Sequence, residues 1–254
     1  MRCAANGKIA WITGAGKGIG RALARRMAEE GWVVAASART AEDLKSLAGE
    51  CPSARVHEFP LDVTVVDQTV ATLAAIEDRL GKLDLVILNA GTHIPLSADN
   101  FSVAPFRHLV ETNLMGTVNC LAQVIPKFIG RRQGHIAVVA SLAGYRGLPT
   151  AAAYGATKAA LINMCEALKP ELEGNGVCIT LINPGFVKTP LTDKNDFPMP
   201  FLISVDEAAE RILLGLKTSD FEISFPWRFS FLMKVLRLLP DHIFFTLSRR
   251  MAGR

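Results

Sequence analysis

The chain has few of the features that mark disulfide-rich, membrane-spanning or secreted proteins. Its five cysteines are odd in number and show no CxxC spacing, which argues against a disulfide framework or a zinc site and favours a reducing compartment. No apolar run approaches the roughly 20 residues that a helix needs to span a bilayer. The strand-like Ile9–Ile12 comes so early that no room is left for the apolar core of a signal peptide. We therefore expect a cytoplasmic protein.

Charge and motif content exclude further classes. A formal charge of +4 over 254 residues is small, so nucleic acid is not an expected partner. The five histidines have no metal-ligand spacing, so no metal is expected and each is interpreted as structural: His57, His93, His108, His135 and His242. The absence of a GxSxG motif means that Ser141 lacks the nucleophile turn of a hydrolase.

A glycine-rich turn, TGAGKGIG at Thr13–Gly20, joins a predicted strand to a predicted helix. Gly14 permits the tight turn, Gly18 lets backbone amides approach a pyrophosphate, and Gly20 allows close packing of helix on strand. A lone turn of this kind is often only a structural loop. Here a second strand, Trp32–Ser37, completes a βαβ unit, which favours a dinucleotide site.

The end of that second strand indicates which dinucleotide binds. An NAD-binding protein places an acid there, about 20 residues beyond the glycines. This sequence has Ser37 and Arg39 instead, with no carboxylate before Glu42, and Lys17 adds a second cation. A guanidinium suits bidentate contact with the 2′-phosphate of NADP. The alternative is that Arg39 is a solvated loop residue.

A hydroxyl, a phenol and an ammonium stand at spacings that fit one active site. Tyr154 and Lys158 form an i,i+4 pair if the residues from about 151 onward are helical. A free phenol has a pKa of about 10, and a nearby ammonium stabilises its phenolate. Ser141 follows the strand-like His135–Ala140, at the sheet edge where ligands bind in open α/β folds. Because Tyr-x-x-x-Lys alone is a common surface or core pair, this prediction depends on the other motifs.

Strand-like and helix-like segments alternate over residues 1–225. The expected strands are Lys8–Ile12, Trp32–Ser37, Arg55–Pro60, Leu83–Leu88, His135–Ala140, Val177–Ile182 and Phe221–Phe225. Further helices are expected at about 65–80, 103–129, 151–173 and 205–217. This alternation predicts a single-domain α/β fold, a doubly wound parallel sheet of about seven strands with helices on both faces. Asn113, inside the helix at 103–129, is either a surface or capping residue or holds a kink and a water.

These motifs together resemble the short-chain dehydrogenase/reductase family over roughly residues 8–225. The resemblance rests on the glycine-rich turn, Asn89-Ala90-Gly91, Asn113, Ser141 thirteen residues before Tyr154, Tyr154-x-x-x-Lys158, and Pro184-Gly185 with Val187 and Thr189. Asp62-Val63 matches the family's adenine contact, and Arg39 with Lys17 matches its NADP-preferring pattern. Leu88 departs from the family, in which many members have the first Asn of NNAG at this place.

The resemblance implies a Rossmann fold and an NADP(H)-dependent carbonyl reductase or alcohol dehydrogenase that transfers a hydride between nicotinamide and substrate. Tyr154 would be the acid/base, Lys158 would lower its pKa and hold the nicotinamide ribose, Ser141 would fix the carbonyl, and Asn113 would support a water relay. The implied cofactor-binding residues are Gly14, Gly16, Lys17, Gly18, Ile19, Gly20, Ser37, Arg39, Asp62, Val63, Asn89, Ala90, Gly91, Tyr154, Lys158, Pro184, Gly185, Val187 and Thr189. Helices 103–129 and 151–173 would pack subunits into a homodimer or homotetramer.

Three interpretations of the function follow. The first is a reductase of an apolar carbonyl, the second a non-catalytic NADPH-binding sensor or scaffold, and the third an alcohol dehydrogenase working oxidatively. The intact set of Ser141, Tyr154, Lys158 and Asn113 argues against a sensor, which needs only the cofactor loop. Substrate choice is expected in residues 92–101 and 186–203. The apolar residues of the second loop predict either an apolar cleft or ordinary lid packing: Phe186, Phe197, Met199, Phe201 and Leu202.

Residues 226–254 form a basic and apolar C-terminal extension, with six Lys/Arg against one Asp. A helix at 228–239 would carry a narrow polar stripe on an apolar cylinder: Ser230, Lys234 and Arg237. A second helix, after Pro240, would set one polar group opposite one apolar group: His242, Thr246, Arg249 and Arg250 opposite Ile243, Phe244, Leu247 and Met251. Basic amphipathic helices of this kind lie in membrane interfaces. The alternative is that they pack on the sheet domain or on a second subunit.

Overall fold

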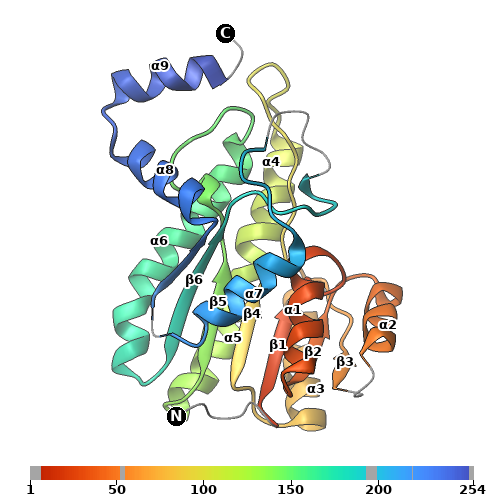
Figure 1. Ribbon diagram of the computed structural model, residues 1–254. Helices are drawn as coiled ribbons and strands as arrows, with labels where there is room; N and C mark the ends of the chain where they lie inside the picture. The colour runs from red at the N-terminus through yellow and green to blue at the C-terminus, as the bar shows by residue number, and fades with distance from the viewer. Residues whose placement is uncertain (1–6, 52–54, 193–198, 219, 252–254) are drawn as a thin grey trace.

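The computed structural model describes residues 7–51, 55–192, 199–218 and 220–251. A parallel seven-stranded sheet runs through the described part, in the order β3-β2-β1-β4-β5-β6-β7 (Figure 1). Its strands are β1 Ile9–Thr13, β2 Val33–Ser37, β3 Val56–Glu58, β4 Leu85–Leu88, β5 His135–Val139, β6 Cys178–Pro184 and β7 Glu222–Phe225. The predicted doubly wound sheet is confirmed, and each expected strand lies within a few residues of its predicted place.

The sheet is built from short apolar runs that are buried on both faces. Every residue of β1 and β4 is buried, as expected for parallel strands that are covered by helices on either side. Trp11 of β1 pairs with Ala35 of β2 on one side and with Val86 of β4 on the other. The strand order therefore reverses between β1 and β4, and ligands bind at such a switch point in open α/β sheets.

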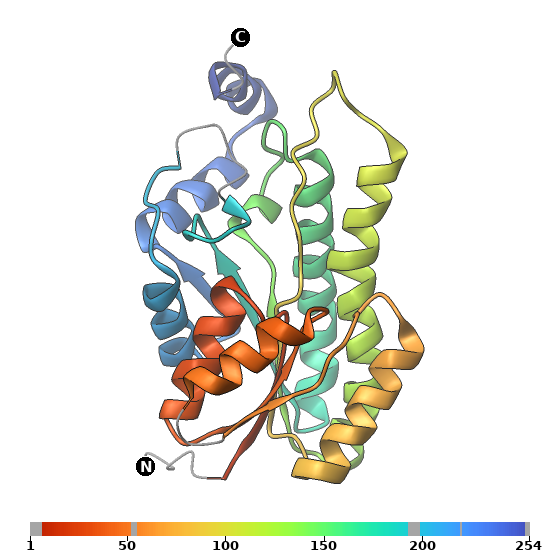
Figure 2. The ribbon, with the colours of Figure 1, turned by 90° about the vertical axis from the view of Figure 1, so that its right-hand side faces the viewer.

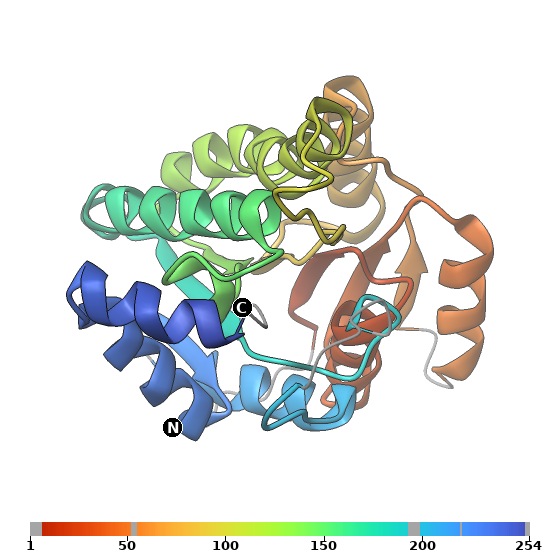
Figure 3. The same ribbon diagram turned by 90° about the horizontal axis from the view of Figure 1, so that it is seen from above.

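Helices cover both faces of the sheet (Figures 2 and 3). One layer holds α1 Gly18–Glu29, α2 Ala41–Glu50 and α7 Val205–Gly215. The other holds α3 Val66–Leu80, α5 Gly116–Gly130 and α6 Ala152–Gly174. Each layer packs its own apolar cluster against the sheet; Leu23 and Met27 of α1 belong to one, and Val124 and Phe128 of α5 to the other.

The helix expected over 103–129 is present and contains a π-helical turn. It consists of α4 Val103–Leu109, the π-helical turn η1 Val110–Met115, and α5. This turn contains Asn113, whose side-chain amide bonds the chain after β4. Helix α2 has no predicted counterpart, because only Leu44 and Leu47 of its ten residues are buried and its apolar pattern is weak.

The C-terminal extension forms two helices, α8 Trp227–Leu238 and α9 Asp241–Met251, at the top of the molecule in Figure 1. Phe229 and Met233 of α8 are buried in the same apolar cluster as α5 and α6, so α8 packs on the body of the fold. Within the described residues, no helix has the length and apolar character needed to cross a membrane. Residues 252–254 and Phe197 lie outside the described residues.

Candidate active site

The turns that follow β1 and β4 are tied together at the switch point of the sheet. The side-chain amide of Asn89 donates to the carbonyl oxygens of Thr13 and Gly14 at 3.0 and 3.1 Å. In return, the Thr13 hydroxyl accepts from the backbone amides of Asn89 and Ala90, both at 3.1 Å. The glycine-rich turn and the Asn-Ala-Gly turn are thus one rigid structure.

The glycine-rich turn leaves no space for side chains on its inner side. Gly18 has φ +56°, and a Cβ there would lie 3.2 Å from Cγ2 of Thr189. A Cβ at Gly20 would overlap the carbonyl of Gly14 and the amide of Asn89. The turn after β1 therefore faces the segment after β6 closely. Together with the start of α1, these segments form a cradle of backbone that suits the pyrophosphate of a dinucleotide.

At the expected 2′-phosphate position the structure brings in an acid that sequence reasoning missed. Arg39 is exposed at the end of β2, but Lys17 lies 3.3 Å from the Asp43 carboxylate of α2. A Cβ at Gly16 would lie 3.0 Å from Cβ of Asp43, so this acid stands directly against the glycine-rich turn. A ribose-binding acid is expected at a strand end, and Asp43 lies six residues past it, in the unpredicted α2.

Two other predicted cofactor residues make contacts within the protein. The buried Ser37 hydroxyl accepts from Nε1 of Trp11 at 2.9 Å, so it is bonded into the core. The Asp62 carboxylate accepts from the amide and the hydroxyl of Thr64, at 3.0 and 2.8 Å. Burial raises the pKa of Asp62, but the two Thr64 hydrogen bonds and the Arg39 charge outweigh it, so the pKa lies below its ordinary value. Asp62 is thus held as a carboxylate at the end of the segment that follows β3.

Lys158 lies buried beneath Tyr154 on α6. Its Nζ donates to the carbonyl oxygen of Val139 at 2.9 Å and lies 5.7 Å from the centroid of the Tyr154 ring. Burial lowers the pKa of Lys158 to about 8. The i,i+4 pair of the sequence is therefore an actual pair on one helix face, and its ammonium is held in low-dielectric surroundings.

Ser141 completes the arrangement from the end of β5. Its hydroxyl accepts from the amide of Ala143 at 3.1 Å and donates to the carbonyl oxygen of Pro184 at 3.4 Å. Burial raises the pKa of Tyr154, and a hydrogen bond with Ser141 opposes the rise only in part. Desolvation therefore has the larger effect on the phenol, and the pKa of Tyr154 lies above its ordinary value.

Asn113 is fully buried in η1, so it is not a surface or capping residue. Its Oδ1 accepts from the amide of Thr92 at 2.7 Å, and its Nδ2 donates to the carbonyl of Thr92 at 3.0 Å and to the hydroxyl of Thr157 at 3.2 Å. A Cβ at Gly91 would lie 3.3 Å from Asn113 Oδ1 and 3.6 Å from Lys158 Nζ. Asn113 lies in a π-helical turn, and both Asn113 and Lys158 approach the turn at Gly91.

The sequence and the fold of this chain were compared with those of known proteins. The model of the short chain dehydrogenase family matches residues 8–198. The chain belongs to this family. It is 39% identical over 246 residues to an uncharacterized oxidoreductase of Myxococcus xanthus, covering 96% of this chain and 97% of the other.

Solved structures of the family share the fold over nearly the whole chain. A short chain dehydrogenase from Burkholderia cenocepacia in complex with NADP is 26% identical and superposes with a TM-score of 0.82, covering 98% of each chain. A short chain dehydrogenase/reductase from Burkholderia phymatum in complex with NAD has a TM-score of 0.81 at 24% identity, covering 87% of this chain and 90% of that one. These two proteins were thus solved with different nicotinamide cofactors, one with NADP and the other with NAD.

The dehydrogenase has a further residue at the phenol that sequence reasoning interpreted as only structural. His93 is buried, and its ring centroid lies 4.8 Å from that of Tyr154 in an edge-on arrangement. It follows Gly91 by two residues, in the loop after β4. In the sequence, only the place of His93 just after a predicted strand could have pointed to it, because ligands bind at such strand ends. Among the described residues no group of acidic, histidine and cysteine side chains forms a metal site.

An aromatic residue of the C-terminal extension packs on the segment that follows β6. Phe186, just after Pro184-Gly185, stacks on Phe229 of α8 with ring centroids 5.3 Å apart, and Phe201 lies 6.3 Å from the same ring. A Cβ at Gly185 would lie 2.7 Å from Phe229, so α8 presses directly on this segment. Phe186 of this segment therefore packs against α8, while Phe201 is 44% exposed.

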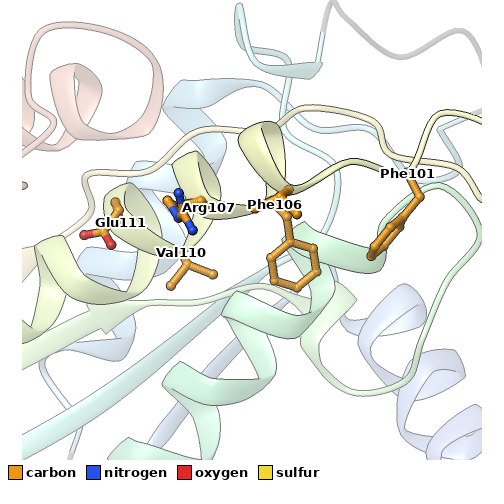
Figure 4. A pocket seen from close by; sticks show the side chains of 6 residues that line it. Phe101, Phe106, Arg107, Val110 and Glu111 are labelled. Carbon is orange, nitrogen blue, oxygen red and sulfur yellow. The ribbon is translucent and has the colours of Figure 1, made fainter.

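A groove of about 440 Å³ lies outside the site (Figure 4). It is lined by Phe101, Val103, Phe106, Arg107, Val110 and Glu111, which come from α4, η1 and the loop before them. Phe101 and Val103 are more than half exposed. No member of the Ser141, Tyr154 and Lys158 group lines it, so the groove is a feature of the outer surface of α4.

Proposed function

We propose that this short-chain dehydrogenase is an NADP(H)-dependent oxidoreductase that reduces an apolar carbonyl compound, with Tyr154 as its acid/base. The observation that carries the proposal is the meeting of three groups at one edge of the sheet. The Tyr154 phenol is bonded to Ser141, and the Lys158 ammonium lies beneath the Tyr154 ring. The glycine-rich cradle faces the same edge, and a nicotinamide cofactor held there supplies the hydride.

Tyr154 and Ser141 serve the carbonyl oxygen of the substrate. With its pKa raised by burial, Tyr154 carries its proton at neutral pH and can donate it to an oxygen that gains negative charge. Ser141 adds a second hydrogen bond to the same atom. Both bonds strengthen as charge develops, so they stabilise the transition state more than the ground state. General acid catalysis is typically worth about 10²–10⁴-fold. Oxidation of an alcohol uses the same groups in reverse.

Lys158 and Asn113 serve Tyr154. The buried ammonium favours the phenolate that forms when Tyr154 gives up its proton. Asn113 fixes the loop at Thr92 and the turn of α6 at Thr157, so it holds the two sides of the site at a constant distance. A water relay past Asn113 remains part of the proposal.

The preference for NADP(H) rests on Arg39. Lys17 is paired with Asp43, which leaves the exposed Arg39 guanidinium as the group suited to a 2′-phosphate. The Burkholderia cenocepacia relative, at 26% identity, was solved with NADP. The expected substrate is apolar because Phe186, Phe201 and Phe229 gather on its side of the site. On this proposal residues 1–225 carry the reaction, and the extension adds Phe229.

We also propose a homodimer or homotetramer and a cytoplasmic location. An apolar face lies on α4, made by the groove and by the exposed Phe101 and Val103 (Figure 4). The family resemblance implies that subunits pack through this helical region. Cys51, Cys120 and Cys165 are buried free thiols, as a reducing compartment allows.

The test is NADPH consumption with a panel of carbonyl compounds, from short aldehydes through β-keto thioesters to long-chain and steroid ketones. We expect turnover that increases with the apolar size of the substrate. NADPH binding without turnover on this panel, or on alcohols with NADP, would favour the non-catalytic sensor or scaffold instead.

A further inference from the structure

Helix α8 directs its polar stripe toward the body of the fold, with Ser230 buried and Lys234 and Arg237 exposed at the edge of the contact. Ser230 is buried and donates to the carbonyl of Pro226 at 3.1 Å. Lys234 lies 2.8 Å from the Glu222 carboxylate of β7. The Arg237 guanidinium lies 5.9 Å from the centroid of the Tyr145 ring. Ser230 is thus bonded within its own helix, while Lys234 and Arg237 contact β7 and Tyr145 in the body of the fold.

The opposite face of α8 is apolar and exposed. Trp227 and Phe231 are each 66% exposed and Leu238 is 83% exposed, with Leu232 and Val235 between them. Residues 227, 231 and 238 follow one another along one side of a helix. A monomeric soluble protein rarely leaves so many large side chains together in water, and such patches mark interaction sites.

Helix α9 also has exposed apolar side chains, and its first turn is attached to the body of the fold. Asp241 pairs with Arg146, and the same guanidinium lies 4.4 Å from the centroid of the buried Phe244 ring. Three further large apolar side chains between positions 241 and 250 are exposed: Ile243, Phe245 and Leu247. We call the exposed apolar residues of both helices the C-terminal apolar surface; its members are Trp227, Phe231, Leu232, Val235, Leu238, Ile243, Phe245 and Leu247.

Positive charge accompanies this surface. Arg228 lies beside the Trp227 ring at 5.4 Å, and Arg249 and Arg250 are exposed in the last turn of α9. The single acid in the described part of the two helices, Asp241, is engaged with Arg146. The two helices therefore present apolar side chains and guanidinium groups, with no opposing carboxylate left for a partner's cations.

We propose that α8 and α9 dock the protein on an anionic phospholipid bilayer. Exposed apolar side chains enter the boundary between headgroups and acyl chains, tryptophan sits at that depth, and arginines meet the anionic headgroups. A two-fold contact of this surface with a second copy is disfavoured, because it would bring Arg228, Arg249 and Arg250 against their equivalents without a carboxylate to pair them. Docking uses none of the groups assigned to the reaction, so it stands independently of the proposed function.

The test is co-sedimentation of the full-length protein with vesicles. Vesicles of phosphatidylcholine with phosphatidylserine are compared with vesicles of phosphatidylcholine alone. We expect sedimentation with the anionic vesicles, at least about ten-fold weaker binding to the neutral ones, and weaker binding as salt is raised. The double variant Phe231→Ser/Leu238→Ser should lose at least about ten-fold in affinity, because it removes two side chains that would enter the lipid.

The matched control is Leu214→Ser on α7, which removes a 57% exposed leucine away from both helices and should leave binding unchanged. Since all three positions are exposed, the variants are expected to fold, and circular dichroism checks this. The proposal is overturned if the intact protein does not sediment with anionic vesicles, or if the Leu214 variant loses as much affinity as the double variant. It is equally overturned if sedimentation velocity shows a dimer that the double variant dissociates while no vesicle binding occurs, because the surface would then be covered by a second copy.

Discussion

The ammonium of Lys158 lies 5.7 Å from the centroid of the Tyr154 ring, in a position where water does not reach it. Its Nζ donates a hydrogen bond to the carbonyl oxygen of Val139. Burial brings the pKa of Lys158 to about 8, from an ordinary value of 10.5. The fold thus holds a charge at the phenol at a cost in stability, which is typical of a functional site.

Lys158→Met should make the protein more stable near neutrality. A lowered lysine pKa means that the charged form destabilises the folded state below pH 8, and that this cost disappears as the pH rises from 8 to 10.5. At about 1.4 kcal/mol per pKa unit, the gain is at most about 3 kcal/mol, reduced by the lost bond to Val139. Urea unfolding of both proteins at pH 7 and pH 10 measures it. A variant that is less stable at pH 7, or whose advantage does not shrink toward pH 10, contradicts the assignment.

The same ionisation should appear in the pH dependence of reduction. The kcat/KM for NADPH reports groups of the free enzyme. It should fall above about pH 8, where Lys158 loses its proton, while Tyr154 with its raised pKa remains protonated. The half-buried Lys169 on the same helix, changed to Gln, is the control and should not alter the profile. A profile that stays flat to pH 10 would show that the charge of Lys158 is not needed.

Substitutions of Arg39 and of Asp43 should change the preference for NADPH over NADH in opposite directions. Arg39→Ala should weaken NADPH binding by about 10- to 100-fold, the worth of a charge-assisted hydrogen bond, and leave NADH binding almost unchanged. Asp43→Asn frees Lys17 from its 3.3 Å ion pair and should strengthen NADPH binding several-fold relative to NADH. Fluorescence titration with both cofactors measures these changes. Equal affinities of the unaltered protein for NADPH and NADH would refute the preference.

Glu222 should make the attachment of α8 sensitive to acid. Burial raises its pKa, but hydrogen bonds from Lys234, Tyr145 and Asn183 outweigh burial, so the folded-state pKa lies below the ordinary 4.5. The stabilisation is therefore present above pH 4.5 and is lost as the pH falls through the lowered value. We consider the rate of amide hydrogen exchange in α8 divided by the rate in α5. This ratio should increase as the pH falls from 5 to 3. In Glu222→Gln the ratio should already be raised at pH 5 and change little on acidification; an unaltered ratio in this variant would contradict the role of Glu222.

The sequence predicted the sheet from its short apolar runs. It predicted that Ser141, Tyr154 and Lys158 lie together from the helical i,i+4 spacing and from the place of Ser141 at the end of a strand. The contacts of Asp43, His93 and Phe229 were missed for one physical reason. Each lies on a helix or loop whose own pattern is unremarkable, and each reaches the site only through tertiary packing. The polar stripe of α8 was not predicted to face the body of the fold either. Its partner Glu222 lies on β7, and helical periodicity does not indicate which face meets the body of the fold.

The measurement that tests the central claim most directly compares Tyr154→Phe with the unaltered protein in two assays, NADPH binding and NADPH-dependent turnover of the best carbonyl substrate. The substitution keeps the ring that packs against His93 and removes only the hydroxyl that forms a hydrogen bond with Ser141. We predict unchanged NADPH affinity and a loss of turnover of at least about 10²-fold. Turnover that survives in the variant would contradict the assignment of Tyr154 as the acid.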